Sequence, residues 1–412
     1  MRLIDYFDKG AELDPNHPLL IDGDTRISYG QAQIASHRIA NGLARKGVQP
    51  GAKACVLSNN STQAVQAVLG LLRAGCVWVT GGPNNDPAEL AAVLDDTDVE
   101  VLFYGPSYRD NIGRLRERLP GLRLVVALEE DDADTPSLAD ITEGMEDEAP
   151  SIERGPDDIA TIFTANCETG IPRGVILTNR QWELLVASSR INTYHPRPVK
   201  LLAAPMAFSV GAMSVLADLV DGATHVVQPG FDPERVMAAI ERYCITYLYM
   251  PPAGIKLMLN HPRVKDYNYS SLRYFVYGGT PATHERIAEA MKVFGPVMLT
   301  GFAPTETGGP VTILSPADHV EAIQRKLPHR LKSVGRATQF ARVEIMDEDG
   351  HILPKGQYGE IVVKTAHLMS GYYTKGQPTP VSPPDDWHHT GYFGHKDTDG
   401  FLYIDEGESE TV

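Results

Sequence analysis

Residues 161–179, TIFTANCETGIPRGVILTN, join an apolar run to a glycine-containing loop and then to a helix start. The run at 159–165 predicts a buried strand, and Thr178 with Gln181 has the spacing of a capping box. Glycines after a strand let backbone N–H groups approach phosphate oxygens, and a nearby cation such as Arg173 adds to those dipoles. The segment lacks the G-x-x-x-x-G-K-S/T spacing, so we expect no nucleoside-triphosphatase loop. Taken alone, it fits a phosphate loop or a surface turn equally well.

Short apolar strands alternate with helix-period segments on both sides of this segment, which predicts a mostly parallel sheet covered on both faces. We expect a first helix capped by Ser28 and Gln31, and further helices near 63–73, 87–94 and 111–119. The expected strands are 54–57, 76–80, 99–104, 122–128, 159–165, 201–205, 224–228, 245–250, 274–277 and 297–300.

Two changes of pattern divide the chain. Residues 129–157 are acidic, contain proline and lack an apolar period, which predicts a surface connection. After residue 330, the strands expected at 343–346 and 360–364 follow each other through a turn, which predicts a small antiparallel, barrel-like unit. We therefore expect an α/β protein with subdomains at 1–155, 156–325 and 326–404, and a short segment at 405–412.

The composition excludes several classes of protein. With 412 residues, of which 42% are hydrophobic and 22% charged, the chain can bury more than one core. The formal net charge of −16 argues against bulk affinity for nucleic acid or an anionic membrane. The chain has four scattered cysteines, an acidic N-terminus and no apolar run long enough to span a bilayer. These features predict a soluble cytoplasmic protein without a transmembrane segment.

Several motifs, in order, resemble the adenylate-forming superfamily, which includes acyl-CoA synthetases, firefly luciferase and peptide-synthetase adenylation domains. Residues 165–174 resemble the family's T-S-G-T-T-G-x-P-K-G loop, and WHHTGYFGHKDTDGFLYI at 387–404 resembles its W-x-x-T-G-D segment and the strand that follows. The other matches are PMAFSVG at 205–211, VYGGTP at 276–281, GFAPTETG at 301–308, SVGRA at 333–337, GEIVVK at 359–364 and SGYY at 370–373. The acyl-CoA synthetase branch looks most similar.

The resemblance implies two similar βαβ-layered subdomains and a small β-barrel, with a ligand cleft at the carboxyl ends of the second subdomain's strands. It also implies attack of a carboxylate on the α-phosphate of ATP, followed by thioester formation with coenzyme A. The substrate would be a carboxylic acid, fatty acids included. The implied cofactors are ATP or AMP, Mg²⁺ and coenzyme A.

The resemblance also implies roles for particular residues. Thr305, Glu306 and Arg173 would be catalytic, with Glu306 holding Mg²⁺. The acyl group would lie against Phe208, Gly211, Met250 and Gly254. The nucleotide would be bound by Thr164, Ala165, Asn166, Cys167, Glu168, Thr169, Gly170, Gly174, Gly278, Gly279, Thr280, Pro281, Gly301, Phe302, Ala303 and Tyr392.

The chain departs from the family pattern at several nucleotide positions. Cys167 and Glu168 replace a loop glycine and threonine, and a carboxylate there repels phosphate by about 1 kcal/mol or more. Arg173 replaces the loop lysine, Tyr392 replaces the ribose-binding aspartate, and Gly407 replaces the hinge arginine. The family also continues past the position of Val412 into a mobile lid with the adenylation lysine.

These departures leave three hypotheses for function. The chain could be an acyl-activating enzyme that works in a complete form, or a degenerate homologue that binds an acyl or adenylate-like ligand without turning over ATP. A third hypothesis makes Cys167 a nucleophile that accepts an acyl group, although Glu168 beside it would raise the thiol pKa. We expect His388 and His389 to lie in a surface turn rather than in a metal site.

Overall fold

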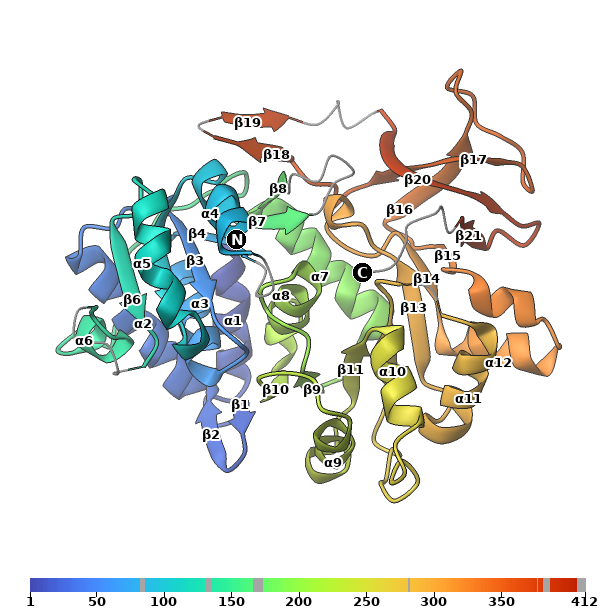
Figure 1. The fold of residues 1–412 in the computed structure, drawn as a ribbon, viewed down its shortest axis with the longest axis horizontal. Helices are drawn as coiled ribbons and strands as arrows, with labels where there is room; N and C mark the ends of the chain where they lie inside the picture. The colour runs from blue at the N-terminus through green and yellow to red at the C-terminus, as the bar shows by residue number, and fades with distance from the viewer. Residues whose placement is uncertain are drawn as a thin grey trace. The chain divides into compact units, whose positions relative to one another are not determined.

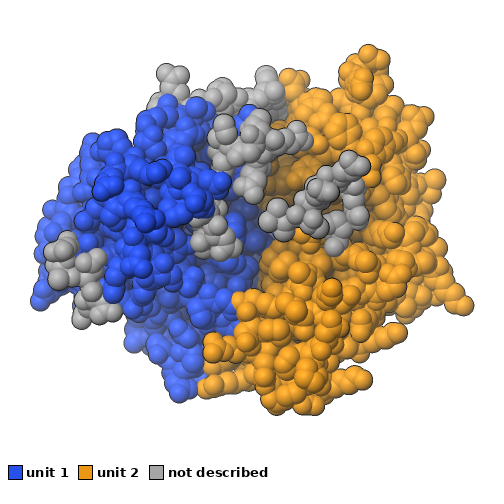
Figure 2. Space-filling view, viewed as in Figure 1, with its two compact units in different colours: residues 1–230, 369–381 blue, residues 231–368, 382–412 orange. Residues whose placement is uncertain are grey.

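The computed structural model describes residues 1–81, 86–129, 135–165, 173–280, 282–375, 377–380 and 386–405 (Figure 1). The chain divides into two compact units, coloured separately in Figure 2. Unit 1 comprises residues 1–230 and 369–381, and unit 2 comprises residues 231–368 and 382–412. Subdomain boundaries at 155 and 325 remain a prediction, because these two units follow a different division.

Unit 1 contains a mixed sheet with the strand order β19-β18-β8-β7-β4-β3-β5-β6. Neighbours from β7 to β6 run parallel, whereas β8, β18 and β19 join through antiparallel pairs. The strands are β3 (Lys53–Leu57), β4 (Val77–Val79), β5 (Val99–Tyr104), β6 (Leu124–Ala127), β7 (Ile159–Ala165), β8 (Arg173–Thr178), β18 (Gly371–Thr374) and β19 (Gln377–Pro380).

Successive side chains of β3 enter two different cores. Ala54 and Val56 pack into one hydrophobic cluster, and Cys55 and Leu57 pack into another. This alternation confirms the prediction of a largely parallel sheet covered on both faces. The helices of unit 1 are α1 (Leu3–Leu13), α2 (Tyr29–Arg45), α3 (Thr62–Arg73), α4 (Pro87–Asp96), α5 (Arg109–Arg118), α6 (Leu138–Thr142), α7 (Asn179–Thr193) and α8 (Ser209–Leu216), with 3₁₀ turns η1 (Pro106–Tyr108) and η2 (Leu219–Asp221).

A further group of strands in unit 1 has the order β9-β10-β1-β2. β9 (Val199–Leu202), β10 (Thr224–Val227) and β1 (Pro18–Asp22) run parallel, and β2 (Thr25–Ser28) is antiparallel to β1. Ser28 ends β2 and caps α2 through the reciprocal capping box with Gln31 that the sequence predicts.

Unit 2 begins with a parallel set, β11 (Tyr247–Met250), β12 (Tyr274–Tyr277) and β13 (Met298–Phe302). The antiparallel strands β14 (Thr312–Leu314) and β15 (Arg336–Ala337) extend it beyond β13. The helices of unit 2 are α9 (Pro233–Tyr243), α10 (Pro252–Leu259), α11 (His284–Phe294) and α12 (Pro316–Gln324), with 3₁₀ turns η3 (Thr305–Thr307) and η4 (Pro328–Lys332).

The expected switch to antiparallel strands is confirmed in the rest of unit 2. β16 (Ala341–Met346), β17 (Tyr358–Thr365), β20 (His388–Lys396) and β21 (Leu402–Ile404) pair antiparallel in that order. Val343, Ile345, Ile361 and Val363 face a small hydrophobic core, which leaves the alternate positions of β16 and β17 on the other face.

Two local predictions are wrong. Arg173 and Gly174 lie in β8 rather than in a loop that enters a helix directly, because 173–178 pairs with β7. His388 and His389 lie in β20 rather than in a turn. The acidic stretch 129–157 is mostly exposed where the structure describes it, and it also includes the short helix α6, which Ser137 caps. Within the described residues, no helix combines the length and apolar character needed to cross a bilayer.

Candidate functional site

The predicted phosphate loop connects the antiparallel strands β7 and β8 of unit 1. Thr164 lies opposite Gly174, and Ala165 lies opposite Arg173, so these four residues flank the loop. Thr164 donates its N–H to Thr80 Oγ1 at 3.1 Å, which ties the end of β7 to the end of β4. The remaining loop residues of the prediction lie outside the described residues: Asn166, Cys167, Glu168, Thr169 and Gly170. The thiol-nucleophile hypothesis for Cys167 is therefore neither supported nor contradicted.

Arg173 is the cation of the predicted loop, and it lies among the described residues. Its side chain is exposed and lies beside an aromatic ring. Its Cζ lies 5.2 Å from the ring centroid of Tyr372 in β18. Tyr372 pairs with Val175, so the ring is a cross-strand neighbour of β8. A guanidinium held over a ring face keeps its charge and its donors, so Arg173 can still meet a phosphate.

The predicted acyl residues of unit 1 lie at the start of α8, where Phe208 is the N-cap and Gly211 lies in the first turn of the helix. Phe208 donates its N–H to Pro205 O at 3.1 Å, and the Phe208 side chain is 38% exposed. A Cβ at Gly211 would lie 2.2 Å from Pro205 O, so the turn requires glycine there. The turn therefore presents one large aromatic side chain above a closely packed backbone.

A buried asparagine that the sequence analysis did not select holds this turn. Asn60 donates to Leu202 O at 3.2 Å and to Ala204 O at 2.9 Å, and it accepts from Met206 N at 2.9 Å. Asn60 is 4% exposed, so these contacts satisfy an amide that would otherwise be costly to bury. The only signal in the sequence is a polar residue between an apolar strand and a helix. That pattern is too common to mark Asn60 as a supporting residue of the site.

In unit 2, the parallel strands β11, β12 and β13 bring several predicted residues to one sheet edge. Met250 ends β11, Gly278 follows β12, and Phe302 ends β13. Because parallel strands end at the same edge, the predicted residues Gly279, Thr280, Gly301 and Ala303 also lie along it. Pro281 lies outside the described residues.

Tyr249 fixes the glycine pair at this edge. Its hydroxyl donates to Gly278 O at 3.0 Å, and burial raises the pKa of Tyr249, which keeps the donor protonated. Gly279 has φ +87°, a conformation that side chains rarely adopt. Gly254 packs against Met250, because the Met250 Sδ would lie 2.5 Å from a Cβ placed at residue 254. The predicted residues Met250 and Gly254 are thus in mutual contact.

Thr305 and Glu306 lie in η3, immediately after the sheet edge. The next residue, Thr307, donates its hydroxyl to Pro304 O at 2.8 Å and to Gly309 O at 2.7 Å. His367, which is fully buried, contacts Thr307 O through Nδ1 at 2.6 Å. Burial lowers the pKa of His367, so the neutral ring carries its proton on Nδ1 and donates it. The sequence analysis did not identify His367.

Glu306 interacts electrostatically with His388 of β20. Burial lowers the pKa of His388, and the negative charge of Glu306 is the leading influence in the opposite direction. The adjacent His389 contacts the carboxylate of Glu360 at 2.7 Å. Glu306 therefore lies within electrostatic reach of an imidazole, and it is partly exposed.

Tyr392, at the predicted ribose position, packs on Phe302. The ring centroids are 5.2 Å apart with an interplanar angle of 79°, and the Tyr392 side chain is 50% exposed. The nearby carboxylate of Glu360 accepts Gly391 N–H at 3.1 Å and contacts His389. The predicted ribose position thus carries an aromatic surface and a single phenol oxygen.

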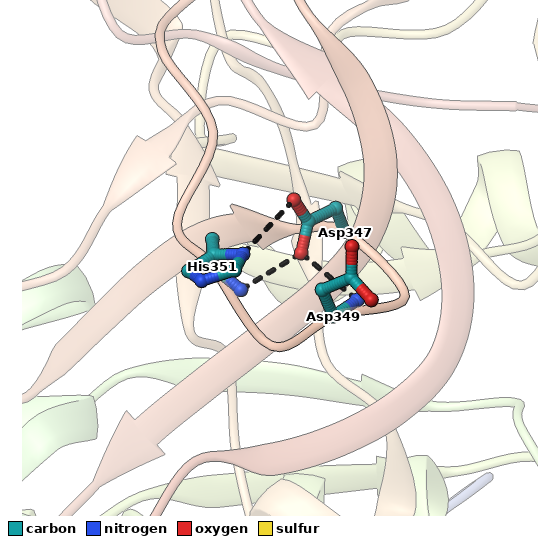
Figure 3. Close-up of side chains that lie close together, drawn as sticks. All are labelled: Asp347, Asp349 and His351. Atoms are coloured by element: carbon teal, nitrogen blue, oxygen red, sulfur yellow. Dashed lines mark hydrogen bonds and ion pairs between the residues drawn. The ribbon is translucent and has the colours of Figure 1, made fainter.

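The group Asp347, Asp349 and His351 has atoms near enough together to suggest a metal site, but it forms a turn between β16 and β17 (Figure 3). Asp347 Oδ1 accepts from Asp349 N at 3.1 Å and from His351 N at 2.8 Å. These bonds, His351 N–H first, lower the pKa of Asp347. The side chains of Asp349 and His351 are exposed, so we interpret the three residues as stabilising the turn rather than as binding a metal.

Gly407, at the predicted hinge position, lies outside the described residues.

Comparison with known proteins adds to this geometry. Residues 7–373 match the family model described as AMP-binding enzyme. The chain is 28% identical over 397 residues to the medium/long-chain-fatty-acid–CoA ligase FadD8 of Mycobacterium tuberculosis, covering 94% of this chain and 68% of that relative. It is 26% identical over 396 residues to feruloyl-CoA synthase of an Amycolatopsis species, covering 96% and 76%. The structure of the inhibitor-bound N-terminal domain of FACL13 from M. tuberculosis matches with a TM-score of 0.86 at 25% identity, covering 98% of this chain and 99% of that domain.

Proposed function

Because the chain belongs to the AMP-binding enzyme family and is of the acyl-CoA ligase type, we propose that it activates a carboxylic acid. A carboxylate oxygen attacks the α-phosphorus of ATP, and the bond to the pyrophosphate leaving group breaks. The thiolate of coenzyme A then attacks the acyl carbon, and AMP leaves. The thiol proton passes to solvent, so the two steps balance.

The observation that carries the proposal is the fixed position of Glu306 at the carboxyl edge of β12 and β13. Thr307 and His367 hold the backbone of η3, which fixes the point at which the Glu306 side chain leaves the chain. A carboxylate oxygen is the ligand type that Mg²⁺ prefers, and Mg²⁺ bound to phosphates would supply charge neutralisation there. We assign the metal role to Glu306 and phosphate contacts to Thr305 and Arg173.

Within unit 2, we assign acyl contacts to Met250 and Gly254, and the same role for Phe208 and Gly211 of unit 1 stays a prediction from the family resemblance. Aromatic and thioether side chains suit an apolar acid, either aliphatic or aromatic. FadD8 and the feruloyl-CoA synthase are named for acids of these two kinds. Cys55 and Cys76 are buried free thiols. Free thiols are typical of a reducing compartment, which supports a cytoplasmic site of action.

The residues present fit ATP unevenly. The backbone of Gly278, Gly279 and Thr280 lies at the sheet edge, where it could contact an adenine. The carboxylate of Glu306 suits Mg²⁺. Tyr392 offers the ribose diol one phenol oxygen in place of two carboxylate oxygens. This misfit favours a second candidate function, that of a homologue which binds an acyl or adenylate-like ligand without ATP turnover.

ATP–pyrophosphate exchange with a panel of fatty and aromatic acids tests both candidates. We expect exchange with at least one acid, and we expect Glu306→Gln to reduce it by about 100-fold or more. Glu285→Gln, which removes an exposed carboxylate from α11, should leave exchange unchanged. The opposite outcome is no exchange with any acid and no binding of ATP and Mg²⁺ by calorimetry. If the double substitution Glu168→Thr with Tyr392→Asp then restores binding or exchange, the second candidate stands and the first fails.

A further inference from the structure

A buried hydrogen bond joins the last residue of β12 to α12 in unit 2. Nε2 of His319 lies 2.8 Å from the hydroxyl oxygen of Tyr277, and the two rings meet edge to face with their centroids 5.8 Å apart. His319 is fully buried, and Tyr277 is 5% exposed. The residue after Tyr277 is Gly278, whose backbone the proposed function assigns to an adenine. The hydrogen-bonded pair is therefore one residue away from a predicted nucleotide contact.

The second ring nitrogen of His319 determines the direction of this hydrogen bond. Nδ1 lies 2.8 Å from Ser315 O, and a carbonyl oxygen can only accept, so the ring proton is on Nδ1. Burial lowers the pKa of His319 to about 4, although Ser315 O and the charge of Asp318 act in the opposite direction. The ring is therefore neutral near pH 7, and Nε2 accepts from the Tyr277 hydroxyl.

The first turn of α12, which carries His319, is itself anchored. Ser315 and Asp318 form a capping box at the N-terminus of this helix. Arg336 of β15 donates from Nη2 to Asp318 Oδ1 at 2.9 Å. Because both contacts hold the first turn, His319 is a fixed acceptor for Tyr277.

Two tyrosines hold the backbone at Gly278 from opposite faces of the sheet. Met250 lies opposite Tyr277 in the register of β11 and β12, and Tyr249 precedes Met250. Because successive side chains of a strand point to opposite faces, Tyr249 and Tyr277 lie on different faces. Tyr249 donates to Gly278 O at 3.0 Å on one face. On the other face, His319 anchors Tyr277, the residue before the glycine.

The described part of the chain leaves the space beside Gly278 open. A Cβ placed at Gly278 would meet no described atom within 4 Å. At Gly279, in contrast, the backbone has φ +87°, and a Cβ would lie 3.1 Å from the Tyr249 hydroxyl oxygen. A flat base can therefore approach the Gly278 backbone closely. Its affinity depends on how firmly that backbone is held before the base arrives.

We propose that Tyr277 and His319 are positioning residues for adenine, and that their hydrogen bond holds Gly278 in the conformation that receives the base. The proposal rests on the proposed function, because that function assigns adenine to this edge of the sheet. It adds two residues that act through Gly278.

Binding of AMP to the full chain, measured by calorimetry, tests the pair without requiring turnover. Tyr277→Phe removes the phenol oxygen and keeps the ring, and we expect the Kd for AMP to rise by about fivefold or more. Tyr274→Phe is the matched control, because it removes a hydroxyl from the other end of the same strand. That variant should bind AMP within about twofold of the unaltered chain.

His319→Leu and a double variant separate positioning from folding. His319→Leu leaves the buried phenol without its acceptor, so we expect it to lower both the free energy of unfolding and the affinity for AMP. Tyr277→Phe combined with His319→Leu replaces both partners by apolar groups, which should restore most of the stability. The affinity for AMP should stay low in this double variant, since the hydrogen bond is still absent. Urea unfolding measures the stability.

Recovery of AMP affinity together with stability in the double variant would show that the pair serves folding alone, and it would overturn the proposal. Unchanged affinity in Tyr277→Phe, an equal loss in Tyr274→Phe, or no AMP binding by the unaltered chain would also overturn it, even if the chain exchanges pyrophosphate. Weakened binding in Tyr277→Phe and in the double variant supports it, even if exchange is absent. The positioning role and the ATP chemistry can thus fail separately.

Discussion

The ring of Tyr392 meets the ring of Phe302 edge to face, with the centroids 5.2 Å apart. Phe302 ends β13 and is 5% exposed, whereas Tyr392 in β20 is 50% exposed. The phenol is therefore positioned by a buried aromatic anchor. A tyrosine side chain has only one oxygen, so Tyr392 cannot accept from two hydroxyls in the way that the two oxygens of a carboxylate can.

Tyr392→Asp should strengthen the interaction of the chain with ATP. A carboxylate can accept from both hydroxyls of a ribose, so we expect the Kd or KM for ATP to fall by about tenfold. Tyr392→Phe removes only the phenol oxygen and should change either constant by no more than about twofold. Exchange kinetics and calorimetry measure both. An equal response to the two substitutions would show that the position does not face the ribose.

Asn60→Ala should destabilise unit 1 and disturb the turn before α8. The substitution removes the amide that serves Leu202 O, Ala204 O and Met206 N. Because the lost partners lie in a largely buried region, we expect the free energy of unfolding to fall by about 2 kcal/mol. Urea unfolding measures it. Asn59→Ala, which removes an exposed bond to Ser107 Oγ, should cost less than about 0.5 kcal/mol. Similar costs for the two variants would contradict the role given to Asn60.

Gly211→Ala should show that the same turn admits no side chain. The new Cβ would lie 2.2 Å from Pro205 O, which is backbone and cannot move aside cheaply. We expect a loss of about 2 kcal/mol or more, by overpacking. Gly113→Ala is a matched helical control, since nothing lies within 4 Å of its Cβ. That variant should stabilise the chain by about 0.5–1 kcal/mol. Thermal unfolding that fails to separate the two variants would reject the close packing at Gly211.

The architecture was more predictable than the site. The strands at 99–104, 159–165 and 274–277 have the expected bounds, because each is a short run rich in β-branched or aromatic residues. The capping boxes at Ser28 and Thr178 are local patterns and are confirmed. Strand β8 was missed because its glycine and arginine suggest a loop, whereas pairing with β7 makes it a strand. Local sequence does not contain that partner.

The supporting residues of the site could not be found from sequence for a similar reason. Asn60 and His367 act through backbone carbonyls that are far away along the chain, with separations of 142 and 60 residues. Such bonds depend on tertiary approach and leave no local motif. Thr305 and Glu306, in contrast, could be selected because a family motif surrounds them.

His225 should make the stability of unit 1 decrease in acid. The ring is fully buried in β10 and lies opposite Lys200 in the register with β9, and neither ring nitrogen has a hydrogen-bond partner among the described residues. Burial first, then the charge of Lys200, lowers the pKa of His225 from 6.5 to about 3, against the smaller effect of Asp218. Above pH 6.5 both folded and unfolded chains hold the ring neutral. Below that pH the unfolded chain takes up a proton that the folded chain refuses until about pH 3.

The free energy of unfolding should therefore fall with decreasing pH, by up to about 1.4 kcal/mol per pH unit from this one group. His225→Leu removes the proton uptake while keeping an apolar side chain in the core. Urea unfolding at pH 7 and pH 5 should show a smaller loss in His225→Leu than in the unaltered chain. His195→Leu, at a partly exposed histidine, should leave the pH dependence as it is. If His225→Leu and the unaltered chain lose stability equally between the two pH values, His225 is protonated in the folded protein and the assignment fails.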